Sequence, residues 1–189
     1  MPMNYSDKND DFSQQKPMLD EAAFWSIIDN SLNHSFNMND QEAWLVSRVE
    51  KMPVEEIVGF RLRTDKLLVD TYVSEMWCAA YIMNDGCSDD GFEYFRCWII
   101  SRGKNVYYKA KSDPDCLVNQ LSSNNLFEFE GFLNVALIAF ENSEVDFSNL
   151  TLEDFHNIEV NYPEIIFNWS ENDPDNMRRI CPTLFDKFL

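Results

Sequence analysis

Residues 84–103 read NDGCSDDGFEYFRCWIISRG, and the signals for a turn and for a helix are clearer here than elsewhere in the chain. The Asp85-Gly86 pair is typical of a turn that follows a helix. The next helix is expected to run from Ser88 to Arg102, because a serine oxygen accepts a hydrogen bond from the free N–H groups of a first turn. Gly103 is placed to end this helix in a left-handed conformation. Helical spacing predicts one apolar face, which consists of Phe92, Phe95, Trp98 and Ile99.

Amphipathic patterns predict further helices on both sides of this stretch. Arg61 and Asp65, four residues apart in one of them, are expected to form an ordinary surface ion pair. Upstream, helices are expected from Asp20 to about Asn33, from Asn39 or Asp40 to about Met52, from Pro53 onward, and from Ser74 to about Met83. Downstream, they are expected from Lys104 to Ser112, from Asp113-Pro114 to about Leu121, and from about Leu126 to Asn142.

After Asn142 the apolar pattern weakens. Short helical turns are expected near Thr151 and over residues 173–180, followed by a closing segment tucked against the body of the protein. Residues 158–161 and 165–169 are rich in residues that favour extended backbone. They could therefore form a small hairpin, although a hairpin is not expected.

The chain has 189 residues, of which 45% are hydrophobic, so it can bury the core of one domain. The predicted fold class is all-α: a single-domain helical bundle of about seven or eight helices, with an irregular C-terminal segment. This domain is expected over residues 19–189. Residues 1–18 are polar and without periodicity, and are expected to be a disordered tail.

The stretch 84–103 also resembles the signature of DUF4240, a bacterial family of unknown function that is sometimes joined to WGR (Trp-Gly-Arg) domains. The resemblance implies a mostly helical bacterial domain over roughly residues 19–189, without an established activity. No WGR domain is present, and Phe185 stands where a tryptophan is expected. The central matches are Asn84 to Phe92, Phe95-Arg96, Trp98 to Ser101, and Gly103. The weaker matches are Phe24-Trp25, Ile57, Phe60, Asp113-Pro114, Pro182, Leu184-Phe185 and Lys187-Phe188.

Charge is distributed unevenly along the chain. The net charge is −18, and residues 112–177 contain fourteen acids but no Lys or Arg. Residues 52–111, by contrast, contain eight basic residues and nine acids. A surface of one sign repels itself unless a surface of the opposite sign lies against it. A nucleic-acid partner is not expected, because phosphate binding requires basic residues.

This segregation of charge predicts a non-enzymatic acidic protein-binding module with a basic protein partner. The most specific version of this prediction is an immunity protein, that is, an inhibitor that covers the basic cleft of a toxin domain. The residues expected to contact the partner are Glu141, Glu144, Asp146, Glu153, Asp154 and Glu159.

An alternative site lies at the start of the helix that begins near Ser88. Several carboxylates there are of the kind that hard cations prefer, so a metal- or ligand-binding enzyme-like site is one interpretation. The other is helix capping, with an ion pair to an arginine that reaches back toward the helix start. Neither a metal nor a cofactor is assigned. The residues concerned are Asp85, Asp89, Asp90, Glu93 and Arg96.

Catalytic motifs are not found. The two histidines, His34 and His156, lie in polar segments, and no P-loop, Gly-x-Ser-x-Gly or His-Glu-x-x-His sequence occurs. The tryptophans have the helical spacing of core residues, although a small-ligand regulatory domain with an aromatic pocket is a further alternative.

The five cysteines show no Cys-x-x-Cys spacing and are expected to be reduced thiols. Cys87 is the most enzyme-like of them, but its acidic neighbours disfavour a thiolate, so we expect a structural role. The sequence has neither a run of 18 apolar residues nor a secretory leader, and a cytoplasmic protein without a membrane partner is expected.

Overall fold

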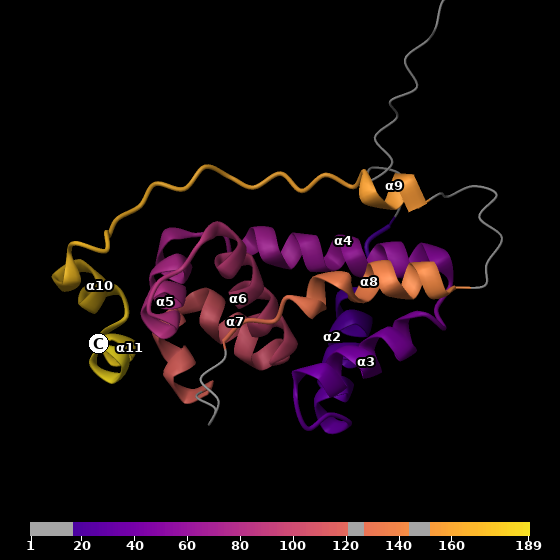
Figure 1. Ribbon diagram of the computed structural model, residues 1–189, viewed down its shortest axis with the longest axis horizontal. Coiled ribbons are helices and arrows are strands. Elements are labelled where there is room, and N and C mark those ends of the chain that lie inside the picture. The colour runs from indigo at the N-terminus through magenta and orange to yellow at the C-terminus, as the bar shows by residue number, and fades with distance from the viewer. Residues whose placement is uncertain (1–16, 121–126, 144–151) are drawn as a thin grey trace, which may run out of the picture.

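The computed structural model describes residues 17–120, 127–143 and 152–189 (Figure 1). These residues form ten α-helices and one 3-10 helix, and none of them is in a strand. The all-α prediction is confirmed, whereas the helix count exceeds the expected seven or eight because the C-terminal part contains three short helices. The predicted tail, 1–18, lies almost wholly outside the described residues.

The elements follow in the order α2 (Glu21–Asn33), α3 (Met38–Val49), α4 (Val54–Asp70), α5 (Ser74–Asn84), α6 (Asp89–Ser101), α7 (Lys104–Ser112), η1 (Pro114–Gln120), α8 (Gly131–Asn142), α9 (Leu152–His156), α10 (Pro174–Ile180) and α11 (Pro182–Phe188). None of the helices in the described ranges has the length and apolarity that a membrane span requires.

Helix starts are set by local side chains, as predicted for α6, where Ser88 Oγ accepts from Gly91 N at 3.1 Å. The predicted start of α3 is two or three positions late, because the cap is Asn37, whose Oδ1 accepts from Asp40 N at 2.9 Å. Ser74 does not cap α5, because its hydroxyl binds Asn168 instead. Gly103 has the expected positive φ of 93°, but its ψ of 169° is extended and makes it the N-cap of α7.

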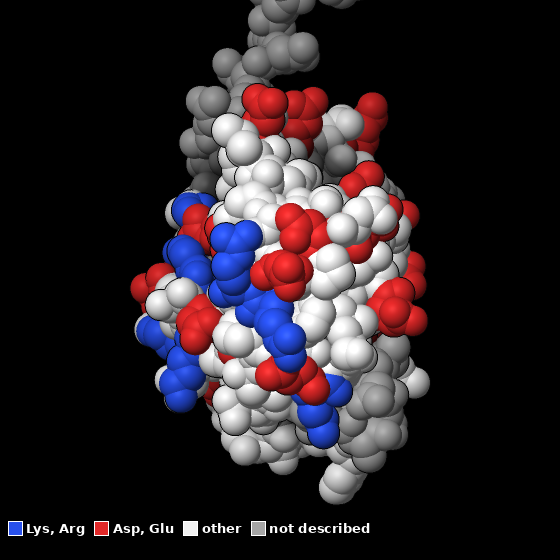
Figure 2. All heavy atoms as spheres, turned by 90° about the vertical axis from the view of Figure 1, so that its left-hand side faces the viewer, with Lys and Arg blue, Asp and Glu red and all other residues white. Residues whose placement is uncertain are grey.

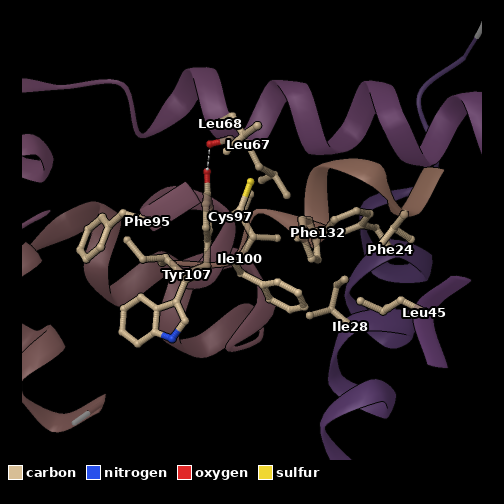
Figure 3. Packing of buried hydrophobic residues seen from close by; sticks show 14 of the residues in the cluster. Phe24, Ile28, Leu45, Leu67, Leu68, Phe95, Cys97, Ile100, Tyr107 and Phe132 are labelled. Atoms are coloured by element: carbon tan, nitrogen blue, oxygen red, sulfur yellow. Dashed lines mark hydrogen bonds between the residues drawn. The ribbon is translucent and has the colours of Figure 1, made fainter. Parts of the chain in front are cut away.

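The core joins residues that are far apart in the sequence. Figure 3 shows side chains of α2, α3, α4, α6, α7 and α8 converging, with the Tyr107 hydroxyl donating to the Leu67 carbonyl at 2.7 Å. The rings of Phe24 and Phe60 lie 4.8 Å apart between centroids. Helical spacing predicts these inward faces, and burial of aromatic and aliphatic side chains stabilises their packing.

One downstream prediction is wrong, and another is made more specific by the structure. The helix expected from about Leu126 begins at Gly131 instead, because Phe129 N donates to Tyr94 O at 2.9 Å, a bond that holds this residue outside the helix. The brief helix predicted after Asp113 is present as a 3-10 helix. The expected start of that segment is correct, whereas its predicted last residue, Leu121, lies outside the described residues.

The C-terminal part forms an arm across the helical body. Residues 157–173, which we call the strap, run as an extended chain along the top of the molecule from α9 to α10 (Figure 1). The helices α10 and α11 pack on α5 and η1. The Asp115 carboxylate accepts from the N–H groups of Thr183 at 3.1 Å and Leu184 at 2.8 Å, and so satisfies the first turn of α11 from a distant element. The predicted irregular segment is thus an extended strap that ends in two short helices.

Candidate functional site

The acids near the start of α6 lie where one helix ends and the next begins. Asp89 and Asp90 are exposed in the first turn of α6, where negative charge favours the helix dipole. Asp85 ends α5 in a left-handed conformation with φ 54° and ψ 45°. Among the residues that the structure describes, no three His, Cys, Asp or Glu side chains converge as metal ligands. The cap of α6 is Ser88, so Asp89 and Asp90 contribute negative charge near the helix dipole rather than the capping bond itself.

Arg96 points into the core of the protein rather than toward the helix start. Only 2% of its surface is exposed. Its Nη1 donates to the Leu68 carbonyl at 2.7 Å and its Nε to the Phe92 carbonyl at 3.1 Å. No carboxylate of the described residues pairs with it, so the expected ion pair with the acids of the first turn is not formed. Carbonyl dipoles stabilise this buried cation in place of a counter-ion.

Three aromatic rings surround the Arg96 guanidinium. Its Cζ lies 4.5 Å from the ring centroid of Phe92 and 5.0 Å from those of Tyr72 and Tyr162. Faces of aromatic rings attract cations, so this arrangement adds to the carbonyl contacts. Tyr162 belongs to the strap, and its hydroxyl donates to Glu93 Oε1 at 3.0 Å. Arg96 and Glu93 therefore hold the strap on α6, while the other members of the predicted site lie outside this contact.

Aromatic pairs attach the strap along its length. Each joins one ring of the strap to one ring of the helical body, and contacts of this kind add stabilisation beyond the area they bury. The pairs, with distances between ring centroids, are Tyr162–Tyr72 at 4.5 Å, Phe167–Trp77 at 5.3 Å and Trp169–Tyr81 at 5.4 Å.

Polar contacts with the first turn of α5 hold the far end of the strap. The Ser74 hydroxyl donates to Asn168 Oδ1 at 2.8 Å and accepts from Asn168 N at 3.2 Å. The Trp169 indole N–H donates to the Ser74 carbonyl at 2.8 Å, and Asn168 Nδ2 donates to Glu75 at 2.7 Å. The strap is thus held at two points, Tyr162 and the Asn168-Trp169 pair.

The predicted partner-binding acids lie on the outside where they are described. Glu141 is exposed at the end of α8, Glu153 is exposed on α9, and Glu159 is exposed on the strap. Asp154 lies in α9, whereas Glu144 and Asp146 fall outside the described residues. The prediction leaves out three exposed acids farther along the same lysine- and arginine-free run: Glu164, Glu171 and Asp175.

The charges on the surface are segregated. Figure 2 shows Lys and Arg side chains in a band on one side of the view, mixed with acids, whereas the top and the right-hand edge carry Asp and Glu alone. The top is the side along which the strap runs in Figure 1. Of the lysine- and arginine-free part of the sequence, α9 and the strap lie along this top side (Figure 1).

The Arg61–Asp65 pair forms as predicted, although Asp65 is buried rather than exposed. Arg61 Nε lies 2.8 Å from one carboxylate oxygen and 2.9 Å from the other. Burial raises the pKa of Asp65, and the charge of Arg61 opposes that rise. The Arg61 guanidinium also lies over the Phe155 ring at 5.9 Å, so this pair supports α9.

The tryptophans take part in packing. Trp25 and Trp98 are buried among other rings, with Trp25 5.2 Å from Tyr107 and Trp98 5.3 Å from Phe127 between centroids. These contacts support the interpretation of Trp25 and Trp98 as core, whereas Trp44, Trp77 and Trp169 are partly buried and pack against the core.

All five cysteines are free thiols. Burial and the nearby Glu128 carboxylate raise the pKa of the Cys87 thiol to about 12. A raised pKa lowers the thiolate fraction at neutral pH, and the thiolate is the species that reacts. We therefore expect iodoacetamide to label Cys87 slowly at about pH 7.5 and faster as the pH rises toward the thiol pKa, as measured by peptide mass spectrometry. Labelling at the rate of free cysteine near neutral pH would contradict this.

A comparison with protein families identifies the family to which the helical body is similar. The profile of a family described as proteins of unknown function, DUF4240, matches residues 19–142. The chain belongs to the DUF4240 family. The DUF4240 match spans α2 to α8, including Arg96 and its partner carbonyls, whereas α9, the strap, α10 and α11 lie beyond it. No curated protein and no solved structure matched the chain.

Proposed function

We propose that this protein is a non-enzymatic acidic protein-binding module that acts in the bacterial cytoplasm. The observation that carries the proposal is the set of exposed acids on α9, the strap and the start of α10. These segments themselves contain neither Lys nor Arg, and Lys66 of α4 lies beside Glu159 at one end of them. In its sharpest form, the protein is an immunity protein that covers the basic active-site cleft of a toxin domain.

The support for a protein partner is electrostatic. A surface of one sign speeds association with an oppositely charged partner and disfavours partners of the same sign. For the same reason, a nucleic acid or an anionic membrane surface is not the expected partner. The acids along the strap are also presented on a backbone that is held at two points, so the partner meets a preformed surface.

The first experiment is a pull-down with the tagged full-length chain from a lysate of its native cells, at low and at high salt, with mass spectrometry of the retained proteins. We expect one basic protein in near-stoichiometric amount that is released by salt. The double variant Glu159→Gln/Glu164→Gln removes two charges from the strap and is expected to reduce retention about fivefold, because exposed charges each contribute modestly.

The matched control is Asp89→Asn/Asp90→Asn, which removes the same charge from the start of α6. This control is expected to retain the partner and its salt dependence. Retention that neither salt nor the strap variant changes would contradict the proposal. Loss of retention in the control alone, with helical content by circular dichroism unchanged, would instead support the alternative ligand site at the start of α6.

A further inference from the structure

We infer that Ile166 and Phe167 of the strap form the apolar anchor with which this protein binds its basic partner. The inference rests on the proposed function and extends it by naming the centre of the contact and the chemistry of the surface that receives it. It implies a partner surface that is apolar at its centre and bordered by Lys and Arg, which a short peptide can also present.

The exposure of these two side chains is unusual for their position. Ile166 is 88% exposed and Phe167 49% exposed. They are the only sequence neighbours among the exposed large hydrophobic residues that the structure describes. Single exposed apolar side chains are common, whereas contiguous exposed apolar surface rimmed by polar residues marks interaction sites.

The strap holds this pair in a defined place. Tyr162 is tied to Glu93 on one side of the pair, and Asn168 and Trp169 are tied to Ser74 on the other. The Phe167 ring also packs against the Trp77 ring, with centroids 5.3 Å apart and ring planes at 72°. Residues that are ordered before binding lose less conformational entropy on binding, so contacts made by this pair contribute more of their energy to affinity.

Acids border the pair on both sides. Glu164 precedes Ile166 by two residues and Glu171 follows Phe167 by four, and both are exposed. Binding energy in protein interfaces concentrates in central apolar residues that a polar rim shields from water. An apolar pair with acids on both sides therefore fits a partner surface that is apolar at its centre and basic at its edge.

The test uses random dodecapeptides displayed on phage and selected at low salt on the immobilised full-length chain. We expect the enriched peptides to combine an apolar core with flanking Lys or Arg. A synthetic peptide of the enriched sequence should bind Ile166→Ala about tenfold more weakly than the unaltered protein, the effect typical of a central anchor. The matched control is Phe36→Ala, which removes a fully exposed side chain outside the strap and should leave the affinity unchanged.

The outcomes separate the inference from the proposed function. Equal affinity for Ile166→Ala and the unaltered protein, or no enrichment of apolar-basic peptides, overturns the inference. If Glu159→Gln/Glu164→Gln weakens peptide binding but Ile166→Ala does not, the acidic binding surface of the proposed function is supported and the inference about Ile166 and Phe167 is overturned. If neither variant changes the affinity for the peptide, both the acidic binding surface and the apolar anchor are overturned. Sedimentation that shows a dimer of the unaltered chain and a monomer of Ile166→Ala would make the pair a contact between two copies, which also overturns the inference.

Discussion

Replacing Arg96 by alanine is expected to lower the free energy of unfolding by about 3 kcal/mol. The guanidinium donates two hydrogen bonds to backbone carbonyls of Leu68 and Phe92, and bonds from a charged donor contribute roughly 1.5–3 kcal/mol each. Part of this loss is offset, because alanine has no charge that must leave water on folding. Alanine also leaves a cavity between three aromatic rings.

Urea unfolding measured by tryptophan fluorescence gives the size of this effect. Hydrogen exchange in the strap should increase in the same variant, because Tyr162 loses the cation that its ring contacts. Arg96→Met keeps much of the volume but not the donors, and is expected to be intermediate. Arg179→Ala, at an exposed position on α10, should stay within about 0.5 kcal/mol of the unaltered protein. An Arg96→Ala variant as stable as Arg179→Ala would show that the buried cation contributes nothing.

Replacing Gly59 by alanine is expected to lower the free energy of unfolding by about 2 kcal/mol, although alanine favours helices by roughly 1 kcal/mol. Gly59 lies within α4, where a Cβ atom would lie 2.8 Å from Leu19 N and 3.0 Å from Pro17 O. Both of these are backbone atoms, so the segment that precedes α2 must move away. The hydrogen bond from Leu19 N to Gly59 O and the burial of the Leu19 side chain are then lost.

Hydrogen exchange at the Leu19 amide tests this mechanism separately from the stability. The amide should be protected in the unaltered protein and exchange freely in Gly59→Ala, while amides in α6 retain their order of protection. Thermal unfolding gives the overall loss. A variant that is more stable than the parent would show that helix propensity outweighs the contact.

Predictions from the sequence are accurate where the causes lie within a few residues. Ser88 begins α6 because its oxygen and the N–H group it caps are three residues apart. The helix from Lys104 to Ser112 has the bounds that the sequence predicts, since glycine before it and Asp113-Pro114 after it are local signals. The pairing of Arg61 with Asp65 is predicted correctly for the same reason, although the burial of Asp65 is not.

The candidate sites are only partly predictable. The absence of Lys and Arg over residues 112–177 is visible in the sequence, and this pattern alone indicates an acidic surface. It does not show that Glu164 and Glu171 lie on an extended strap, or that Ile166 between them stays outside while Trp169 turns inward.

The sequence by itself determined the all-α class, most helix bounds and the sign of the surface, because propensity, capping and charge act between near neighbours or along the whole chain. Only the tertiary structure decided the position of Arg96, the late start of α8 and the path of the strap. Each depends on a partner far along the chain: Leu68 lies 28 residues before Arg96, Tyr94 precedes Phe129, and Ser74 lies 95 residues before Trp169. A residue whose partner is that distant carries no local signal of it, because only folding brings the two together.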